Sequence, residues 1–462
     1  MPPERRRVLY LLTAAVVLSY FLFFTWKGIA MYFDADDVMN LYFVWTKPWA
    51  EVFKALMFYW SDFYRPMGGL FYRAVFALAG FNPLPFHLVC LAIGIFNIGL
   101  CAWFAKLITG SERVVALAAL MFAFQPRLIE VWYRPAAIYD LLCFTFFYVA
   151  ACLYIASRRN NEKLGPWRVI AILICYILAL DTKEMAVALP VILLAWELLF
   201  ARGGRKRLRL VTVMAVMNLP YVYGKTHGAS LLANNPFYKP EYSWNRFTHS
   251  WAQYVNYILV RETIVPWSAI AILLLLLAIA IGCRSQVLGL AWAVIVFGTL
   301  PVSFIPYRGG FVLYIAWAGW VLYAAVVLVM LQDLLLRYRP QWRVPVACVI
   351  FALVGWRTGK LSLREQRKDP RPWLFDPPKN IAAMTTQMRA LQPTLPRGAK
   401  LLFLEDSFST DEWTPYFVMK LAWHDETMTV DRVKMLAPKI PDQGSYQYIF
   451  TYHDGRYKRL TP

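Results

Sequence analysis

Long apolar blocks, separated by short polar breaks, fill the chain from Val8 to about residue 357. Most of these blocks approach the ~20 residues that an α-helix needs to cross the hydrocarbon core of a bilayer. The pattern therefore predicts an α-helical polytopic membrane protein with about eleven transmembrane helices. The expected spans cover residues 8–26, 84–107, 113–126, 136–157, 167–181, 185–201, 209–224, 264–283, 287–306, 311–332 and 344–357.

Residues 358–462 lack this pattern and predict a separate, small α/β domain. A proline-rich stretch at 370–378 predicts a linker. After it, residues 400–405 read as a strand, 412–423 as a helix and 446–459 as a hairpin about an Asp-Gly turn. The segment has no Gly-rich phosphate loop, so we expect it to cap a site or bind a partner rather than to catalyse.

The transmembrane domain, residues 1–357, contains two connections that are longer than the others. They cover residues 32–83 and 225–263, and both are rich in Trp, Tyr and Phe. Aromatic side chains collect at the level of the lipid headgroups. We therefore predict that these large outer loops form amphipathic helices or loops that lie on the bilayer surface.

The composition and the placement of charge fix the class of protein. Apolar residues make up 59% of the chain and charged residues 16%, against about 25% charged residues in soluble domains, which argues against a soluble enzyme. The net charge of +20 comes from Lys and Arg that cluster in every other break between spans, as the positive-inside rule requires of cytoplasmic breaks. We predict a cytoplasmic N-terminus, an extracytoplasmic C-terminus and no nucleic-acid partner. The seven cysteines form no CxxC motif and offer no disulfide framework.

An acidic cluster, Asp34, Asp36 and Asp37, directly follows the first span. Carboxylates that repel one another beside lipid have raised pKa values, which suits one of them to general-base catalysis. The same residues equally suit the start of a solvated helix, where aspartate is a preferred cap. A divalent cation at Asp34, Asp36 or Asp37 is a third interpretation, and the sequence indicates no other cofactor.

Six further charged residues lie at the edges of apolar blocks on the same predicted side of the membrane. Charge in this position is costly unless it is paired or faces a polar cavity. Arg65 either clamps a lipid phosphate or extends to the headgroups. Lys183 and Glu184 either form a structural ion pair or line a cavity for an anion. The six residues are Arg65, Glu130, Arg134, Lys183, Glu184 and Arg308.

The order of these residues along the chain resembles that of the motifs of the GT-C superfamily of polytopic membrane glycosyltransferases. The likeness covers roughly residues 8–340 and is greatest to protein O-mannosyltransferases and to the related tetratricopeptide-bearing enzymes. The chain departs from that second group at Gln125, where a histidine is usual, at Asp181-Thr182 before Lys183, and in lacking a tetratricopeptide array. The matching positions are Asp36-Asp37, Tyr64-Arg65-Pro66, Pro126, Glu130, Arg134, Lys183-Glu184, Leu189-Pro190, Glu197 and Arg308.

The resemblance implies an inverting hexosyltransferase that uses a polyprenyl-phosphate-linked sugar and an extracytoplasmic protein, lipid or glycan acceptor. It implies that Asp36, paired with Asp37, is the base, with Asp34 as the alternative. Glu130 would orient the acceptor or the sugar. The residues that would neutralise the departing lipid phosphate are Arg65, Arg134, Lys183 and Arg308, with Glu184 beside them.

Two other functions stay open at this point. A flippase for lipid-linked sugars is also polytopic, but it needs charges along a path through the membrane, whereas the candidates lie on one side. A non-catalytic assembly subunit would tolerate neutralisation of the acidic cluster. The compact chain predicts a bacterial inner-membrane protein surrounded by membrane lipids.

Overall fold

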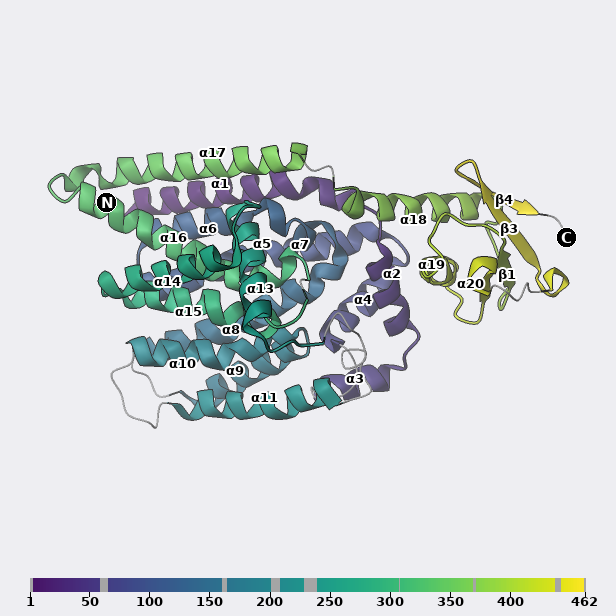
Figure 1. The fold of residues 1–462 in the computed structure, drawn as a ribbon, viewed down its shortest axis with the longest axis horizontal. Helices are drawn as coiled ribbons and strands as arrows, with labels where there is room; N and C mark the ends of the chain where they lie inside the picture. The colour runs from purple at the N-terminus through teal and green to yellow at the C-terminus, as the bar shows by residue number, and fades with distance from the viewer. Residues whose placement is uncertain are drawn as a thin grey trace.

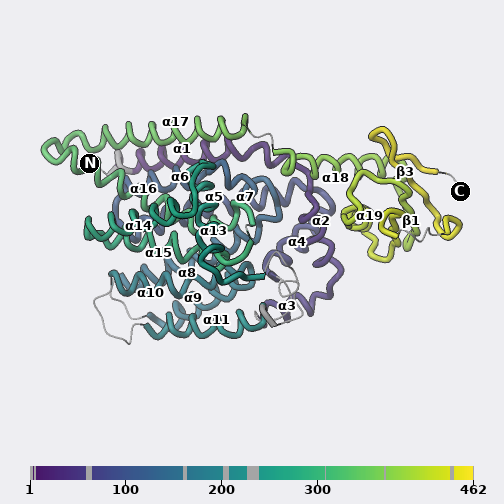
Figure 2. The backbone as a smooth tube through the Cα atoms, viewed as in Figure 1, coloured from purple at the N-terminus to yellow at the C-terminus, as the bar shows by residue number. Residues whose placement is uncertain are grey.

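The computed structural model describes residues 3–58, 65–159, 164–200, 208–227, 239–306, 308–368, 371–436 and 442–460. A bundle of helices makes up most of the molecule, and a small α/β domain lies at one end of it, opposite the N-terminus (Figure 1). The path of the chain in Figure 2 places three short helices, α2 (Ala35–Trp45), α3 (Trp49–Met57) and α4 (Pro66–Ala79), at the end of the bundle that faces this domain.

Long apolar helices make the chain an integral membrane protein. Within the described ranges, five helices are long and apolar enough to cross a membrane, and three shorter apolar helices accompany them. The long ones are α1 (Pro3–Ile29), α5 (Pro83–Thr109), α8 (Ile138–Arg159), α16 (Tyr314–Leu335) and α17 (Arg343–Lys368), and the shorter ones are α9 (Pro166–Leu180), α14 (Pro266–Gly282) and α15 (Gln286–Thr299).

Each of the eleven expected spans coincides with a helix, but some of these helices are too short to cross a bilayer. Both α6 (Glu112–Ala123) and α10 (Leu189–Phe200) have 12 residues, which reach ~18 Å at 1.5 Å per residue, against ~30 Å of hydrocarbon. A 3₁₀ turn follows α6 at Pro126–Leu128, and η3 (Glu184–Ala188) precedes α10. The charged breaks therefore shorten the helices beside them.

The described part of the first large loop, residues 32–83, contains α2, α3 and α4, and residues 59–64 lie outside it. The second, residues 225–263, begins with the end of α11 (Arg209–His227) and contains α13 (Trp244–Leu259). Its middle, residues 228–238, lies outside the described residues. Helix α13 is amphipathic, with Trp251, Tyr254 and Val255 buried.

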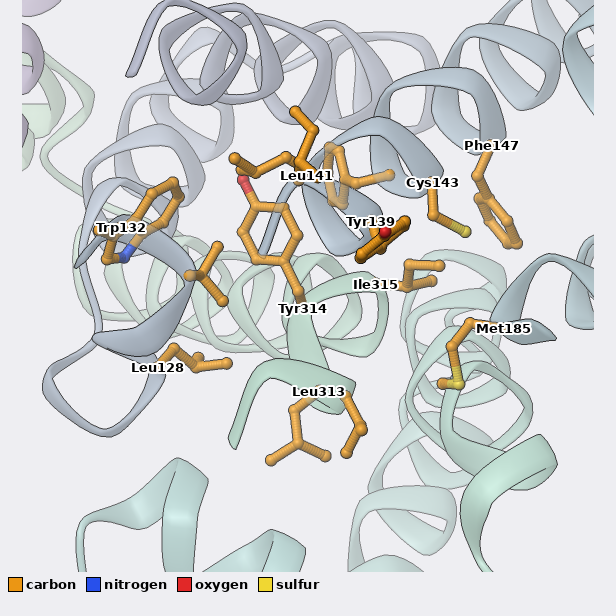
Figure 3. Close-up of a cluster of buried hydrophobic side chains, with 14 of the residues drawn as sticks. Leu128, Trp132, Tyr139, Leu141, Cys143, Phe147, Met185, Leu313, Tyr314 and Ile315 are labelled. Carbon is orange, nitrogen blue, oxygen red and sulfur yellow. The ribbon is translucent and has the colours of Figure 1, made fainter. Parts of the chain in front are cut away.

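Aromatic side chains fill the core of the bundle. Figure 3 shows Tyr314 of α16 among residues from distant parts of the chain, including Trp132, Leu141 and Met185. The Tyr314 ring lies edge-on to Trp132, with ring centroids 5.4 Å apart, and within 4.9 Å of Phe144. Such dense packing of large rings resists local movement, so it gives a rigid base to the residues at the end of the bundle.

The C-terminal domain contains the three elements that the sequence predicts. Strand β1 (Lys400–Phe403), helix α19 (Thr414–Ala422) and the hairpin of β3 (Tyr448–His453) and β4 (Arg456–Leu460) are all present. The sheet has the order β2-β1-β3-β4, with β1 parallel to both neighbours, and β2 (Thr429–Arg432) is an additional strand. At the hairpin turn Asp454 and Gly455 both have positive φ, of 50° and 77°, as a type I′ turn requires.

The structure has a helix over residues 372–378, where the sequence predicts a proline linker, and Pro370 lies outside the described residues. Helix α17 continues as far as Lys368, and Pro372 begins a further helix, α18 (Pro372–Leu391), as its first residue. Proline suits this first position because its missing N–H has no partner there in any helix. Pro377 and Pro378 lie inside α18, so helices lead almost directly from the membrane domain into the sheet.

Helix α19 of the C-terminal domain packs directly on α2. The hydroxyl groups of Tyr42 and Tyr416 lie 3.1 Å apart, and the ring of Phe417 is 5.1 Å from that of Tyr42. His424 stacks on Phe76 of α4, with ring centroids 5.2 Å apart. The domain thus holds the C-terminal half of α2, and the N-terminal half of that helix carries the acidic cluster.

Candidate active site

Residues from five stretches of the chain surround one cavity of about 170 Å³, and α2 and the residue before α4 are among them. Helices α2 and α4 lie at the end of the bundle nearest the C-terminal domain (Figure 1). Seven of the nine predicted site residues line it. The two that do not are Asp34 and Asp37 of the acidic cluster. The lining residues that the sequence singles out are Asp36, Arg65, Glu130, Arg134, Lys183, Glu184 and Arg308.

Asp34 and Asp37 hold the start of α2 together. The Asp34 carboxylate accepts a hydrogen bond of 3.0 Å from the Asp37 backbone N–H, and the Asp37 carboxylate accepts one of 2.9 Å from the Asp34 N–H. This reciprocal arrangement is a capping box. Asp37 is fully buried and also accepts a hydrogen bond from the Tyr72 hydroxyl at 2.9 Å. Burial, and then the charge of Asp34, raise the pKa of Asp37. The helix-cap interpretation therefore describes these two residues.

Asp36 differs from its two neighbours because it faces the cavity. Residues 36 and 37 lie about 100° apart around a helix, so adjacent carboxylates point in different directions. Desolvation by the surrounding protein, and next the charge of Asp34, raise the pKa of Asp36, while Arg134, Arg308 and Arg65 oppose the shift. A carboxylate of raised basicity among cations is the arrangement that general-base catalysis needs.

Arg65 and Glu184 form an ion pair on one wall of the cavity. The Nη2 atom of Arg65 donates to both carboxylate oxygens of Glu184, at 2.9 and 3.0 Å. Burial by itself would raise the pKa of Glu184, but the charge of Arg65, and then that of Lys183, lower it to about 2. Arg65 precedes Pro66 and has a left-handed backbone conformation, with φ of 54°, which is uncommon for a residue that carries a side chain.

Lys183 forms a second and more deeply buried ion pair with Asp140. The distance from Lys183 Nζ to Asp140 Oδ1 is 2.6 Å, and the two side chains are 3% and 7% exposed. The sequence analysis missed Asp140. A single carboxylate near the start of the predicted span at 136–157 was the signal that should have identified it, because such a charge is costly without a partner.

Arg134 links the cavity to the acidic cluster. Its Nε atom lies 2.8 Å from Asp34 Oδ2, and its Nη1 atom lies 4.0 Å from Glu130 Oε2. Burial raises the pKa of Glu130 to about 7, although the charge of Arg134 opposes the shift. Glu130 therefore changes its charge near neutral pH, and both residues occupy the cavity wall.

Arg308 also lines the cavity, and it directly precedes Gly309 and Gly310. Its charge stabilises the ionised form of Asp36, so the two side chains face the same space. Gly309 has a φ of 105°, and a Cβ atom on Gly310 would lie 2.4 Å from the backbone oxygen of Arg127. Only glycine permits this backbone conformation and this close approach. The two glycines fix the loop that presents Arg308.

Two uncharged residues of the cavity also escaped the sequence analysis. Asn40 of α2 accepts a hydrogen bond from the Tyr139 hydroxyl at 3.1 Å, and both side chains line the cavity. The Tyr139 ring in turn packs on Gly68 of α4, where an added Cβ would lie 2.0 Å from the ring.

Gly68→Ala is therefore expected to destabilise the protein by roughly 1–3 kcal/mol, because the methyl group forces Tyr139 out of its place. Thermal unfolding in detergent checks this result. Gly99→Ala is the matched control, since a Cβ there meets no atom within 4 Å. Equal unfolding temperatures for the two variants would contradict the packing.

The divalent-cation interpretation stays a prediction. Among the described residues, no group of three or more His, Cys, Asp or Glu side chains is placed to hold a metal ion. The Asp34 and Asp37 carboxylates are held by the capping box and turned away from Asp36.

Comparisons with known proteins show the fold. No family model matches the chain, and no curated protein sequence matches it. The crystal structure of ArnT from Cupriavidus metallidurans bound to undecaprenyl phosphate matches with a TM-score of 0.53 at 14% identity, over 97% of each chain. The apo structure of the same protein matches with a TM-score of 0.52 at 14% identity, over 98% of this chain and 97% of that one. The expected GT-C fold is confirmed. The particular resemblance to O-mannosyltransferases stays a prediction.

Proposed function

We propose that the protein is an inverting glycosyltransferase that moves a sugar from a polyprenyl-phosphate carrier to an acceptor hydroxyl. The observation that carries this proposal is a cavity in which one carboxylate of raised pKa, Asp36, faces Arg308 and is flanked by further cations. The full-length likeness in fold to a protein crystallised with undecaprenyl phosphate supports the choice of carrier.

Asp36 is the base in this mechanism. Its carboxylate takes the proton of the acceptor hydroxyl, and the acceptor oxygen forms a bond to the anomeric carbon of the sugar. The bond between that carbon and the phosphate oxygen breaks on the opposite face, so the configuration inverts and the polyprenyl phosphate leaves with the bonding electrons. Asp34 and Asp37 are unsuited to this step, because their carboxylates cap α2.

We assign the stabilisation of the departing phosphate to Arg308, because it lines the cavity with Asp36 and its charge acts on that carboxylate. Arg65, Arg134 and Lys183 form ion pairs with Glu184, Asp34 and Asp140, so we assign these three cations the positioning of carboxylates rather than direct binding of phosphate. Fixed cations in a site that excludes bulk water stabilise developing negative charge without reorganising. Asn40, Tyr139 and Glu130 remain to bind the sugar or the acceptor.

The resemblance to O-mannosyltransferases favours a hexose as the sugar. The predicted topology places the cavity on the extracytoplasmic side, where the charged residues of the site meet the ends of the apolar helices. A bacterial inner membrane with a cytoplasmic N-terminus is the setting that we propose.

The test is release of radiolabelled hexose from hexosyl-phosphoundecaprenol by purified protein in detergent. We expect Arg308→Gln to raise the KM for the donor by about tenfold or more, because a charged hydrogen bond to phosphate is lost. Arg246→Gln is the control, since this arginine lies outside the cavity and pairs with the exposed Glu241. Absence of sugar release by the parent protein in detergent, together with transbilayer movement of the intact donor once the protein is reconstituted in liposomes, would overturn the transferase and favour a flippase.

A further inference from the structure

A second and larger cavity, of about 630 Å³, lies beside the first. It is bounded by the end of α13 and the turn into α14, by the end of α17, by the start of α18 and by the segment before α7 (Glu130–Tyr133). Since α14 and α17 are apolar helices, their ends place this cavity at the border between lipid and water. The function proposed above makes no use of it.

Glu130 lines both cavities. Arg134 lines the first cavity and lies 4.0 Å from the Glu130 carboxylate, and Arg371 lines the second cavity and its charge also acts on Glu130. A transferase must bring two substrates to one reacting atom. Two adjoining cavities with a shared wall provide separate places for the two substrates.

The second cavity carries an excess of positive charge. Four cations and three carboxylates line it. Two of the carboxylates, Glu262 and Glu365, lie 3.1 and 3.4 Å from the same cation, Arg127. The remaining charged residues are Arg261, Lys368 and Arg371, with Glu130 as the only carboxylate besides the two that Arg127 holds.

Arg371 has a fixed place among these cations. It is 4% exposed, it has a left-handed backbone conformation with φ of 49°, and it precedes the first residue of α18. Arg261 and Lys368 are exposed at the opening of the cavity. The cavity thus has one buried arginine, whose charge acts on Glu130, and two exposed cations, which suits an acidic ligand that enters from solvent.

We propose that this second cavity is the acceptor subsite, and that it binds a phosphate or carboxylate group of the acceptor through Arg261, Lys368 and Arg371. The proposal rests on the transferase function proposed above. An acceptor anchored there presents its hydroxyl past Glu130 to Asp36, while the donor phosphate occupies the first cavity beside Arg308. The enzyme thereby selects acceptors that carry an acidic group near the hydroxyl that receives the sugar.

Equilibrium dialysis of radiolabelled inorganic pyrophosphate against the full chain in detergent tests the subsite, with saturating undecaprenyl phosphate present to occupy the first cavity. We expect pyrophosphate to bind under these conditions. The double variant Arg261→Gln/Lys368→Gln is expected to weaken this binding by about tenfold, because two exposed charge contacts are lost. Lys379→Gln in α18 is the matched control, because this exposed lysine lies outside the cavity.

Displacement of pyrophosphate by undecaprenyl phosphate would overturn the subsite, because both anions would then share the first cavity. Equal binding by the double variant and the parent would also overturn it. If pyrophosphate binding depends on Arg261 and Lys368 but no sugar is released from the donor, the transferase fails and the acceptor role fails with it. If sugar is released and pyrophosphate does not bind, the subsite alone fails.

Competition experiments then identify the source of the acidic group. Displacement of pyrophosphate by phosphatidylglycerol in nanodiscs, but not by phosphatidylcholine, indicates a lipid headgroup. Displacement by soluble glycerol phosphate, without an effect of phosphatidylglycerol, indicates a soluble acceptor. Either result supports a subsite for an acidic group, and failure of both competitors to displace pyrophosphate contradicts it.

Discussion

Asp36→Asn is expected to lower the rate of sugar transfer by about a hundredfold to ten-thousandfold, which is the usual contribution of a general base. The substitution keeps the size of the side chain and removes only its ability to take a proton. Because Asp36 takes no part in the capping box, the variant should fold normally and bind undecaprenyl phosphate as the parent does. Sugar release from hexosyl-phosphoundecaprenol, measured beside carrier binding, checks both parts.

Asp37→Asn is the matched comparison. This residue is adjacent in the sequence, but it caps α2 and accepts a hydrogen bond from Tyr72, so its replacement should lower thermal stability more than Asp36→Asn does. The loss of a helix cap typically costs about 1 kcal/mol. Unchanged turnover in Asp36→Asn would show that Asp36 is not the general base.

The dependence of turnover on pH separates the roles of Asp36 and Glu130. A base must be ionised, so turnover should fall as the pH drops through the pKa of Asp36, which is raised above the ordinary 3.8. The acidic limb is therefore expected at a higher pH than for an ordinary aspartate. Glu130 has a pKa of about 7. If its charge affects the binding of the substrates, turnover should show a second change near neutral pH. Glu130→Gln should abolish that change and leave the limb that belongs to Asp36.

Lys183→Met is expected to lower the free energy of unfolding by about 3–5 kcal/mol, because it leaves the carboxylate of Asp140 buried without its cation. The two side chains lie 2.6 Å apart and are almost completely buried. The double variant Lys183→Met/Asp140→Leu should regain most of the loss, since it removes both charges together. Unfolding of the purified protein in detergent, followed by circular dichroism, measures the difference.

Lys379→Met provides the comparison for this ion pair. Lys379 pairs with Asp376 at 3.1 Å, but their side chains are 72% and 55% exposed, so its loss should cost less than about 1 kcal/mol. A similarly small effect for Lys183→Met would show that the buried ion pair contributes little to the free energy of unfolding. A double variant less stable than Lys183→Met would show that Asp140 has another partner.

Much of the architecture follows from the sequence because its causes are local. Apolar blocks form helices wherever they occur, since the backbone in lipid must satisfy its own hydrogen bonds. The elements of the C-terminal domain at 400–403, 414–422 and 448–460 likewise follow from periodicity and an Asp-Gly turn. The errors arose where local signals conflicted. The prolines at 370–378 suggested a linker, but α18 begins at Pro372 and contains Pro377 and Pro378, and it packs against β4 and α19.

The sequence by itself determined that this is an integral membrane protein and that its unusual charges belong to a few short breaks between helices. Only the tertiary structure decided which charges meet. The local sequence does not distinguish Asp34, Asp36 and Asp37 from one another. In the folded protein Asp36 lines the cavity, and the other two carboxylates form the capping box of α2. Lys183 required Asp140, which lies 43 residues away. Ion pairs and cavities depend on distances between segments that are remote along the chain, and helix packing alone fixes these distances.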